Sequence, residues 1–354
     1  MRVRGGAVGP ARRPPLHRGS KPVPLLGFIT RSRYHAMGVS FLSLSVPAFG
    51  MLFSLAIIGL ATLLHGVKEG IGVGVGTVLL AFLSLSFISQ QWVTFHIPWH
   101  LSLIFTVVVA CGALRIGISW GNLLAGATAL AGIGIAVIHL QIPDSAEHRN
   151  QALFRDLPLM ELPDLGASQG PKTFDDPNDP DANDANAVMP IDLGSSPLVG
   201  IFMATFVILL FVTMCLARYA QAVLMNPGGF GREFRALDLG RRFTIVTLAL
   251  LSVTFVSSVS SSDPKSGIFQ DLFILAASVY IVQGIALAHA LVKRYRLQGT
   301  WLFLMYTGIF LGPFLLPGLA LLIHLALLLA GFSDTWMNYR ARLTHRTPGD
   351  DEDR

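Results

Sequence analysis

A few polar side chains interrupt long apolar runs in the last third of the chain, and each is a candidate for chemistry. Tyr280 and Gln283 lie three residues apart, which places them on one face if residues 268–292 form a helix. His289 follows on the same run, and His324 stands in the middle of a later one. Because polar groups inside lipid are costly, we predict that these four side chains face a solute. The alternative is that they hydrogen-bond a neighbouring helix.

The sharpest local motif is a turn followed by an aromatic and basic stretch. Asn-Pro and Gly-Gly at residues 226–229 predict a tight turn, since glycine adopts positive φ at no steric cost. Phe230 and Phe234 lie four apart, so a helix there would have an apolar face. Arg232, Glu233 and Arg235 would then point to water or to lipid phosphate.

This motif has two interpretations. It is either a structural elbow along the inner leaflet, or a surface that docks a cytoplasmic partner or covers an anionic solute. A docking or lipid-phosphate loop of this kind would consist of Asn226, Pro227, Gly228, Gly229, Phe230, Arg232, Arg235, Arg241 and Arg242.

The sequence contains no recognisable catalytic motif: His-Glu-x-x-His, Gly-x-Ser-x-Gly and P-loop patterns are all missing. Acid–base catalysis needs a titratable pair held within reach, and we expect the apolar runs to supply neither such a pair nor buried carboxylates for proton-coupled pumping. His96 and His100 have a helical ligand spacing, but Pro98 favours an outer loop there. Residues 175–181 lack the spacing of a calcium loop. We predict no enzyme, catalytic residue, metal or cofactor.

These residues must be positioned by long apolar segments of the chain. The chain is 52% hydrophobic and only 13% charged, and almost no charge falls within residues 71–89, 101–114, 123–141, 198–217, 243–259 and 268–292. A bilayer core about 30 Å thick needs about 20 such residues. Spanning backbone must satisfy its own hydrogen bonds, which predicts an all-α, polytopic transmembrane helix bundle with the lipid bilayer as its main partner.

Two longer apolar runs, residues 34–66 and 300–332, contain helix breakers near their middle. Pro47 and Gly50 interrupt the first, and Gly312-Pro313 with Pro317-Gly318 interrupt the second. We predict that each run is a helical pair with one short member, giving ten helical segments. A single kinked span in each run would give eight.

Basic residues fix the expected orientation. Twenty of the 26 Lys and Arg residues lie in residues 1–33, 218–242, 293–296 and 340–354. The positive-inside rule places all four clusters, and both termini, in the cytoplasm. The net charge of +5 is therefore attributed to loops rather than to nucleic-acid binding. We expect the first apolar run to be a retained anchor.

The expected domain organisation follows this pattern. Residues 1–33 form a basic disordered tail, and residues 34–141 and 198–338 form two sets of membrane helices, the second with a cytoplasmic amphipathic loop at 218–242. Residues 142–197 carry eleven Asp and Glu and form a largely disordered periplasmic loop. Residues 339–354 form a charged tail.

Glycines at a spacing of four favour close helix packing. Gly66, Gly70 and Gly74 form such a set, which allows two helix backbones to approach closely. Packing within the bundle is the first interpretation, and oligomerisation is the alternative.

Several motifs resemble one known family. Residues 226–237 (Asn-Pro-Gly-Gly-Phe-Gly-Arg-Glu-Phe-Arg-Ala-Leu), residues 283–293 (Gln-Gly-Ile-Ala-Leu-Ala-His-Ala-Leu-Val-Lys) and Asp334-Thr-Trp are similar to the YybS-like bacterial multi-pass membrane proteins. Residues 28–74 are also similar, whereas the acidic loop is longer than the family pattern. The resemblance implies a bacterial inner membrane. The family is a domain of unknown function, so it implies no reaction.

A weaker resemblance is to the S components of energy-coupling-factor vitamin transporters. Ala36, Ser40 and Pro47, followed by the glycines at 66, 70 and 74, follow the order of small residues, proline break and glycine-rich helix in those proteins. The resemblance implies a solute-binding bundle. Our leading hypothesis is therefore an inner-membrane protein that binds or moves a small solute, and the alternative is a scaffold that docks a cytoplasmic protein.

Overall fold

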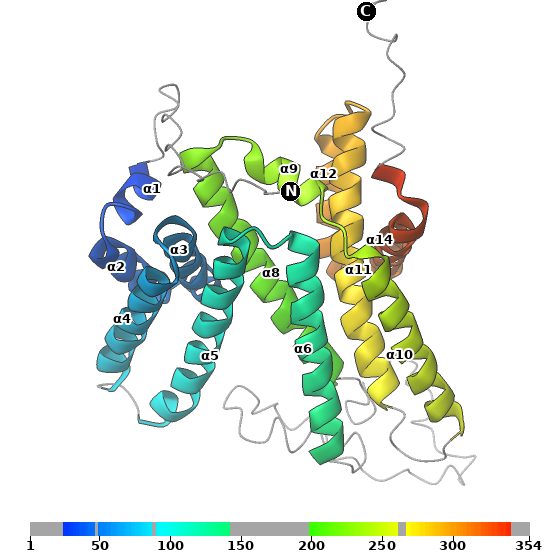
Figure 1. Cartoon of the computed structure of the whole chain (residues 1–354), viewed down its shortest axis with the longest axis horizontal. Coiled ribbons are helices and arrows are strands. Elements are labelled where there is room, and N and C mark those ends of the chain that lie inside the picture. The colour runs from blue at the N-terminus through cyan, green and yellow to red at the C-terminus, as the bar shows by residue number, and fades with distance from the viewer. Residues whose placement is uncertain (1–23, 47–48, 87–89, 142–197, 261–266, 341–354) are drawn as a thin grey trace, which may run out of the picture. The chain divides into compact units, whose positions relative to one another are not determined.

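The computed structural model describes residues 24–46, 49–86, 90–141, 198–260 and 267–340, and all regular structure in these ranges is helical (Figure 1). Thirteen helices occur in them. They are α1 (Pro24–Ile29), α2 (Arg33–Ser43), α3 (Gly50–His65), α4 (Val67–Ser86), α5 (Gln90–Arg115), α6 (Trp120–Gln141), α8 (Leu198–Met225), α9 (Gly229–Arg235), α10 (Gly240–Ser260), α11 (Gly267–Arg294), α12 (Thr300–Phe310), α13 (Gly312–Leu315) and α14 (Pro317–Met337).

The predicted all-α fold is confirmed. Ten of these helices correspond to the ten predicted segments, and the three others, α1, α9 and α13, have seven residues or fewer. Helix α1 lies within the stretch that was expected to be a disordered tail. The acidic stretch 142–197, with its calcium-like residues 175–181, lies outside the described residues, as does most of each terminal tail.

One local prediction is wrong. The segment around Pro98 was expected to be an outer loop, but its backbone belongs to α5. The apolar residues on both sides of Pro98 sustain the helix, because one proline removes a single backbone donor and the remaining turns still close their own hydrogen bonds.

Both long apolar runs are helical pairs, as the breakers predict. The first run forms α2 and α3, and a Cβ at Gly50 would overlap the carbonyl oxygen of Ser43, so the return into α3 requires glycine. In the second run Leu316 lies outside the helical region (φ −144°, ψ 74°) just before Pro317, the first residue of α14. A residue that precedes proline is pushed out of the helical region, which separates α14 from the short α13 that follows α12.

Five described helices, α4, α6, α8, α11 and α14, are long and apolar enough to cross a membrane. A sixth span is possible if α9 and α10, bent by 45°, act as one. Helices α3 and α12, and residues 100–115 of α5, are apolar but shorter. The chain is thus a multi-pass membrane protein, and the exposed apolar side chains of α10 are compatible with contact to lipid.

The chain divides into two compact units that interleave along the sequence. Unit 1 takes residues 1–123 and 209–236, and unit 2 takes residues 124–208 and 237–354. Helices α6 and α8 are therefore each divided between the two units.

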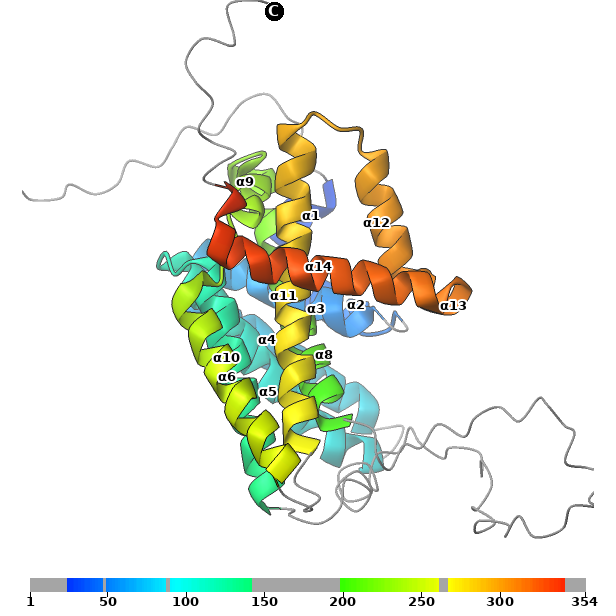
Figure 2. The ribbon, with the colours of Figure 1, turned by 90° about the vertical axis from the view of Figure 1, so that its right-hand side faces the viewer.

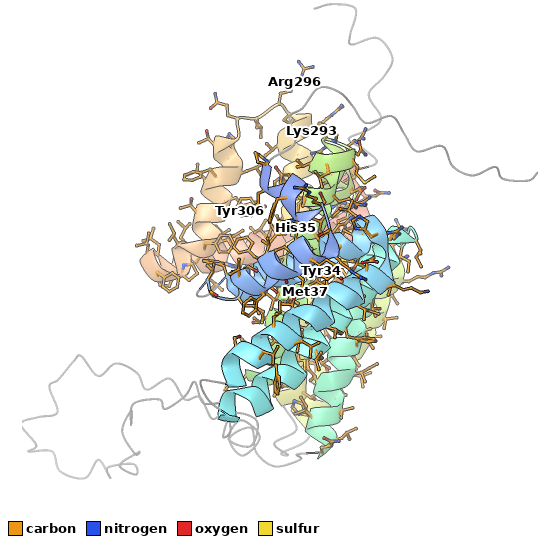
Figure 3. The ribbon with its side chains drawn as sticks, turned by 90° about the vertical axis from the view of Figure 1, so that its left-hand side faces the viewer. Tyr34, His35, Met37, Lys293, Arg296 and Tyr306 are labelled. Atoms are coloured by element: carbon orange, nitrogen blue, oxygen red, sulfur yellow. The ribbon has the colours of Figure 1, made fainter. Side chains whose placement is uncertain are left out.

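In unit 1, α3 packs against α2, α4 and α5, and its fully buried Ile58 belongs to the core. Figure 3 shows Tyr34, His35 and Met37 along α2. The side chain of Met37 lies directly on Gly76 of α4, where a Cβ would overlap it. The small residue thus sets the close approach of α2 and α4.

In unit 2, α14 runs across α11 instead of alongside it (Figure 2). The crossing is made at Gly284 and Gly331. A Cβ on Gly284 would overlap the carbonyl oxygen of Leu327, and a Cβ on Gly331 would overlap that of Tyr280. Because the two backbones touch, this crossing depends on glycine at both positions.

Candidate functional site

A cavity of about 600 Å³ lies among α1, α2, α3 and α4 of unit 1. This volume falls within the usual range for small-molecule sites. Its wall is apolar and consists of Ile29, Ala36, Ile57, Leu60, Ala61, Leu64 and Val73. Its polar lining consists of Thr30, Arg31, Ser32, Arg33, His65 and Glu69.

The charge of the cavity lining is mainly positive. Arg31, Arg33 and His65 are exposed, whereas Glu69 is half-buried. Part of the apolar wall is well buried, since Leu60 of α3 is 2% exposed. An apolar chamber that carries two guanidinium groups suits a ligand with an apolar body and an anionic group.

Local structure positions the two segments that supply the basic lining of the cavity, the start of α2 with Arg31 and Arg33 and the end of α3 with His65. Ser32 caps α2 by accepting a hydrogen bond from the backbone N–H of His35, which fixes the start of α2 beside Arg31 and Arg33. At the far end of α3, Gly66 adopts φ +108° and reverses the chain into α4. Arg115 donates to the last carbonyl groups of α3, so this turn is held from α5 as well.

The three glycines singled out from the sequence all lie in unit 1, where they serve different purposes. Gly66 makes the turn between α3 and α4. A Cβ on Gly70 would overlap the hydroxyl of Thr62, and a Cβ on Gly74 would lie 2.5 Å from Ile104 of α5. These contacts correspond to packing within the bundle, the first of the two interpretations.

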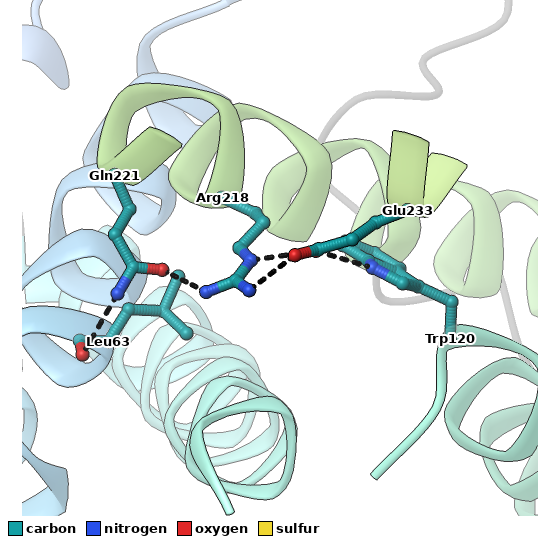
Figure 4. A network of polar contacts seen from close by, with 5 residues as sticks. All are labelled: Leu63, Trp120, Arg218, Gln221 and Glu233. Carbon is teal, nitrogen blue, oxygen red and sulfur yellow. Dashed lines mark hydrogen bonds and ion pairs between the residues drawn. The ribbon is translucent and has the colours of Figure 1, made fainter. Parts of the chain in front are cut away.

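A second polar site in unit 1 joins α8 to α9, as Figure 4 shows. Arg218 donates from Nη2 to Oε1 of Glu233 over 2.6 Å, and from Nε to Oε2 over 2.8 Å. The indole N–H of Trp120 also donates to Oε2, over 3.3 Å. Gln221 accepts from Arg218 and donates to the Leu63 carbonyl. One carboxylate thus ties α9 to α8 and to the start of α6.

The predicted outward orientation of Glu233 is therefore wrong. The forked guanidinium of Arg218 offers two donors in one plane, which a carboxylate matches better than water does. These hydrogen bonds hold the pKa of the Glu233 carboxyl below its ordinary value, and burial opposes them only in part. Helix α9 has seven residues and lies outside the five long spans.

The predicted turn is present in the backbone. Gly228 adopts φ +81° as the cap of α9, and the N–H of Gly229 donates to the Asn226 carbonyl. Pro227 is exposed between them. The rings of Phe230 and Phe234 lie 5.9 Å apart, and Phe230 also meets Trp120 edge-on at 6.2 Å. The aromatic face of α9 therefore packs on the protein.

The four arginines of the predicted docking loop are divided between the units. Arg232 and Arg235 belong to unit 1, where Arg232 is exposed and Arg235 is half-buried. Arg241 and Arg242 belong to unit 2 and are exposed. Docking of a cytoplasmic protein by all four together remains a prediction.

The predicted solute-facing residues lie in unit 2, where they contact neighbouring helices. The hydroxyl of Tyr280 donates to Thr244 over 3.0 Å. Gln283 is fully buried, accepts from the N–H of Leu239 over 3.3 Å and donates to Thr335 over 3.2 Å. These bonds match the alternative that the stripe hydrogen-bonds neighbouring elements.

The two histidines of that prediction also contact other groups. Nε2 of His289 lies 2.8 Å from the Tyr306 hydroxyl of α12. Nδ1 of His324 lies 2.7 Å from the Ala320 carbonyl of its own helix. Neither histidine lines the cavity of unit 1.

The structure corrects the expectation that the apolar runs hold no titratable pair and no buried carboxylate. His139 and Asp271 lie 2.7 Å apart, with side chains 6% and 2% exposed. A second pair lies just beyond the run 300–332, where Asp334 pairs with Arg340 over 3.0 Å and Arg340 also reaches the Leu237 carbonyl. Sequence reasoning missed both pairs because it considered each residue by its place on its own helix.

Comparison with known proteins found no matching family model, no matching curated protein and no matching solved structure. The resemblances described above therefore remain predictions. Among the described residues, no three His, Cys, Asp or Glu side chains are grouped so that they could hold a metal ion.

Proposed function

We propose that this multi-pass membrane protein binds a small amphiphilic anion in the cavity of unit 1. The observation that carries the proposal is the cavity itself: about 600 Å³ with an apolar wall, and with Arg31 and Arg33 in its lining. The guanidinium groups would bind the anionic group, and the wall of α3 would cover the apolar part.

The weaker sequence resemblance supports a solute-binding role for the same helices. Ala36 lines the cavity from α2, and Gly66, Gly70 and Gly74 position α4 against α3 and α5. These positions are among those that resemble the S components of vitamin transporters. The proposal thus keeps the leading hypothesis and moves the site away from Tyr280 and Gln283.

The charge distribution supports access from the cytoplasm. Arg31 and Arg33 belong to the basic cluster that the positive-inside rule assigns to that side. A ligand would then enter with its anionic group at the inner headgroup level. The bacterial inner membrane and this orientation are parts of the proposal.

The test is titration calorimetry of the full-length protein in nanodiscs of neutral lipid, with dodecyl phosphate as the probe. Replacing both Arg31 and Arg33 by glutamine should weaken binding roughly tenfold or more, because each charged hydrogen bond contributes about 1.5–3 kcal/mol. Lys68→Gln is the matched control, since Lys68 is exposed on α4 and does not line the cavity.

Two further titrations measure the separate contributions of the anionic group and the apolar chain to binding. Inorganic phosphate lacks the apolar chain, and dodecyl maltoside lacks the charge, so both should bind more weakly than dodecyl phosphate. Equal binding of either compound, or an unchanged affinity in the double glutamine variant, would overturn the proposal.

A further inference from the structure

The His139–Asp271 pair joins three candidate spans of unit 2 at one point. Nε2 of His139, at the end of α6, lies 2.7 Å from Oδ2 of Asp271, in the first turns of α11. The other carboxylate oxygen, Oδ1, accepts from the backbone N–H of Gly200 in α8, also over 2.7 Å. Both carboxylate oxygens are therefore occupied.

Gly200 allows this arrangement by its size. A Cβ there would overlap the backbone of Asp271, so α8 touches α11 directly at the carboxylate. Asp271 itself is 1% exposed. The histidine and the backbone N–H are the hydrogen-bond partners of this buried carboxylate. Water cannot easily replace either of them there.

The other titratable residues of these three helices lie far from the His139–Asp271 contact. His139 is the only titratable residue of α6. On α8 the titratable residues are Cys215, Arg218 and Tyr219, all at least 15 residues from Gly200. On α11 the nearest is Tyr280, nine residues and about 14 Å away along the axis. The chain just beyond these helix ends, with Asp144, Asp263 and Lys265, lies outside the described residues.

The contact geometry limits how many protons the pair can hold. With one shared proton, either His139 donates to the carboxylate or the protonated carboxyl donates to a neutral imidazole. A second proton places an O–H on one of the two carboxylate oxygens and removes the negative charge. The donor that faces this oxygen, the imidazolium or the N–H of Gly200, then loses its charged acceptor and is held more weakly.

We propose that His139 and Asp271 form a proton-binding site whose second protonation weakens the attachment of α6 or α8 to α11. The ligand is the proton itself, and the site is independent of the unit 1 cavity in the residues that form it. Ionisable groups within spanning helices are functional candidates by default, and this pair has both a titratable donor and a titratable acceptor.

Hydrogen exchange of the full-length protein in nanodiscs, followed by mass spectrometry, tests this proposal. From neutral to acidic buffer, and after correction for intrinsic exchange, the peptides at the end of α6 or the start of α8 should lose protection roughly tenfold or more, the effect of losing a hydrogen bond to a charged group. The double variant His139→Gln/Asp271→Asn places two amides at this contact and has no titratable group there, so this acid response should disappear.

The matched control is His289→Gln, which removes a histidine of α11 that contacts Tyr306 and not Asp271. This variant should retain the acid response of the wild type. The wild-type measurement is decisive even if a variant does not fold. Protection at both helix ends that does not change in acid, or an unchanged acid response in the double variant His139→Gln/Asp271→Asn, would overturn the proposal.

Discussion

The two units of this protein differ in where they bury titratable side chains. Unit 1 places Arg31, Arg33 and His65 at an apolar cavity, where their side chains are exposed. Unit 2 also has exposed arginines, but it buries two close pairs, His139 with Asp271 and Asp334 with Arg340.

The difference indicates two roles for these side chains: ligand binding in unit 1 and attachment of structural elements to each other in unit 2. A buried charge must be paired, because desolvation costs several kcal/mol per ion in a protein interior. The His139–Asp271 pair therefore fixes α6 to α11, and the Asp334–Arg340 pair fixes the end of α14 to the chain that follows it. An exposed guanidinium beside an apolar wall keeps donors that a ligand can use. The predictions below test this contrast, beginning with the largest expected effect.

Removing one member of a buried pair should be the most damaging change. Asp334→Leu leaves the Arg340 guanidinium, whose side chain is 16% exposed, without its carboxylate. We expect a loss of about 3 kcal/mol in unfolding free energy, measured by denaturant titration in mixed micelles. The control is Arg31→Gln in unit 1, which should cost less than about 0.5 kcal/mol. Equal losses in both variants would contradict the contrast.

The helix crossing of unit 2 should tolerate no added volume. In Gly284→Ala the new methyl group overlaps the Leu327 carbonyl, and we expect a loss of about 2 kcal/mol in thermal or denaturant unfolding. Gly318→Ala on α14 is the matched control, because nothing lies within 4 Å of its added Cβ. A stable Gly284→Ala variant would show that α14 does not cross α11 at this point.

The half-exposed pair of unit 1 should give the smallest effect, and one that depends on pH. The folded-state pKa of Glu233 is lowered, so its contribution to stability is present above the ordinary Glu pKa of about 4.3 and is lost as the pH falls through the folded-state value. Glu233→Gln should cost less than about 1 kcal/mol at neutral pH. The difference from wild type should shrink in acid. A difference that grows in acid would contradict the assigned pair.

The helices could be predicted from the sequence because their signals are local. Apolar length predicts the long helices. The breakers lie where the two longest runs divide: Pro47 between α2 and α3, and Gly312-Pro313 with Pro317-Gly318 between the end of α12 and the first turn of α14. These features depend on neighbouring residues, and lipid allows few alternatives to a helix.

The polar contacts could not be predicted in the same way. His139 and Asp271 are 132 positions apart, so no spacing rule connects them. Helical periodicity placed Glu233 on the outward face of α9, because it could not show that Arg218, on another helix, faces it. The cavity also depends on α1, which the basic tail composition concealed.

Native mass spectrometry of the full-length protein with added dodecyl phosphate tests the central claim most directly. Leu64→Trp should fill the cavity from α3, whereas Phe53→Trp, on an exposed part of the same helix, should not. The account predicts one bound dodecyl phosphate on wild type and on Phe53→Trp, and none on Leu64→Trp. The same adduct on all three proteins would contradict it.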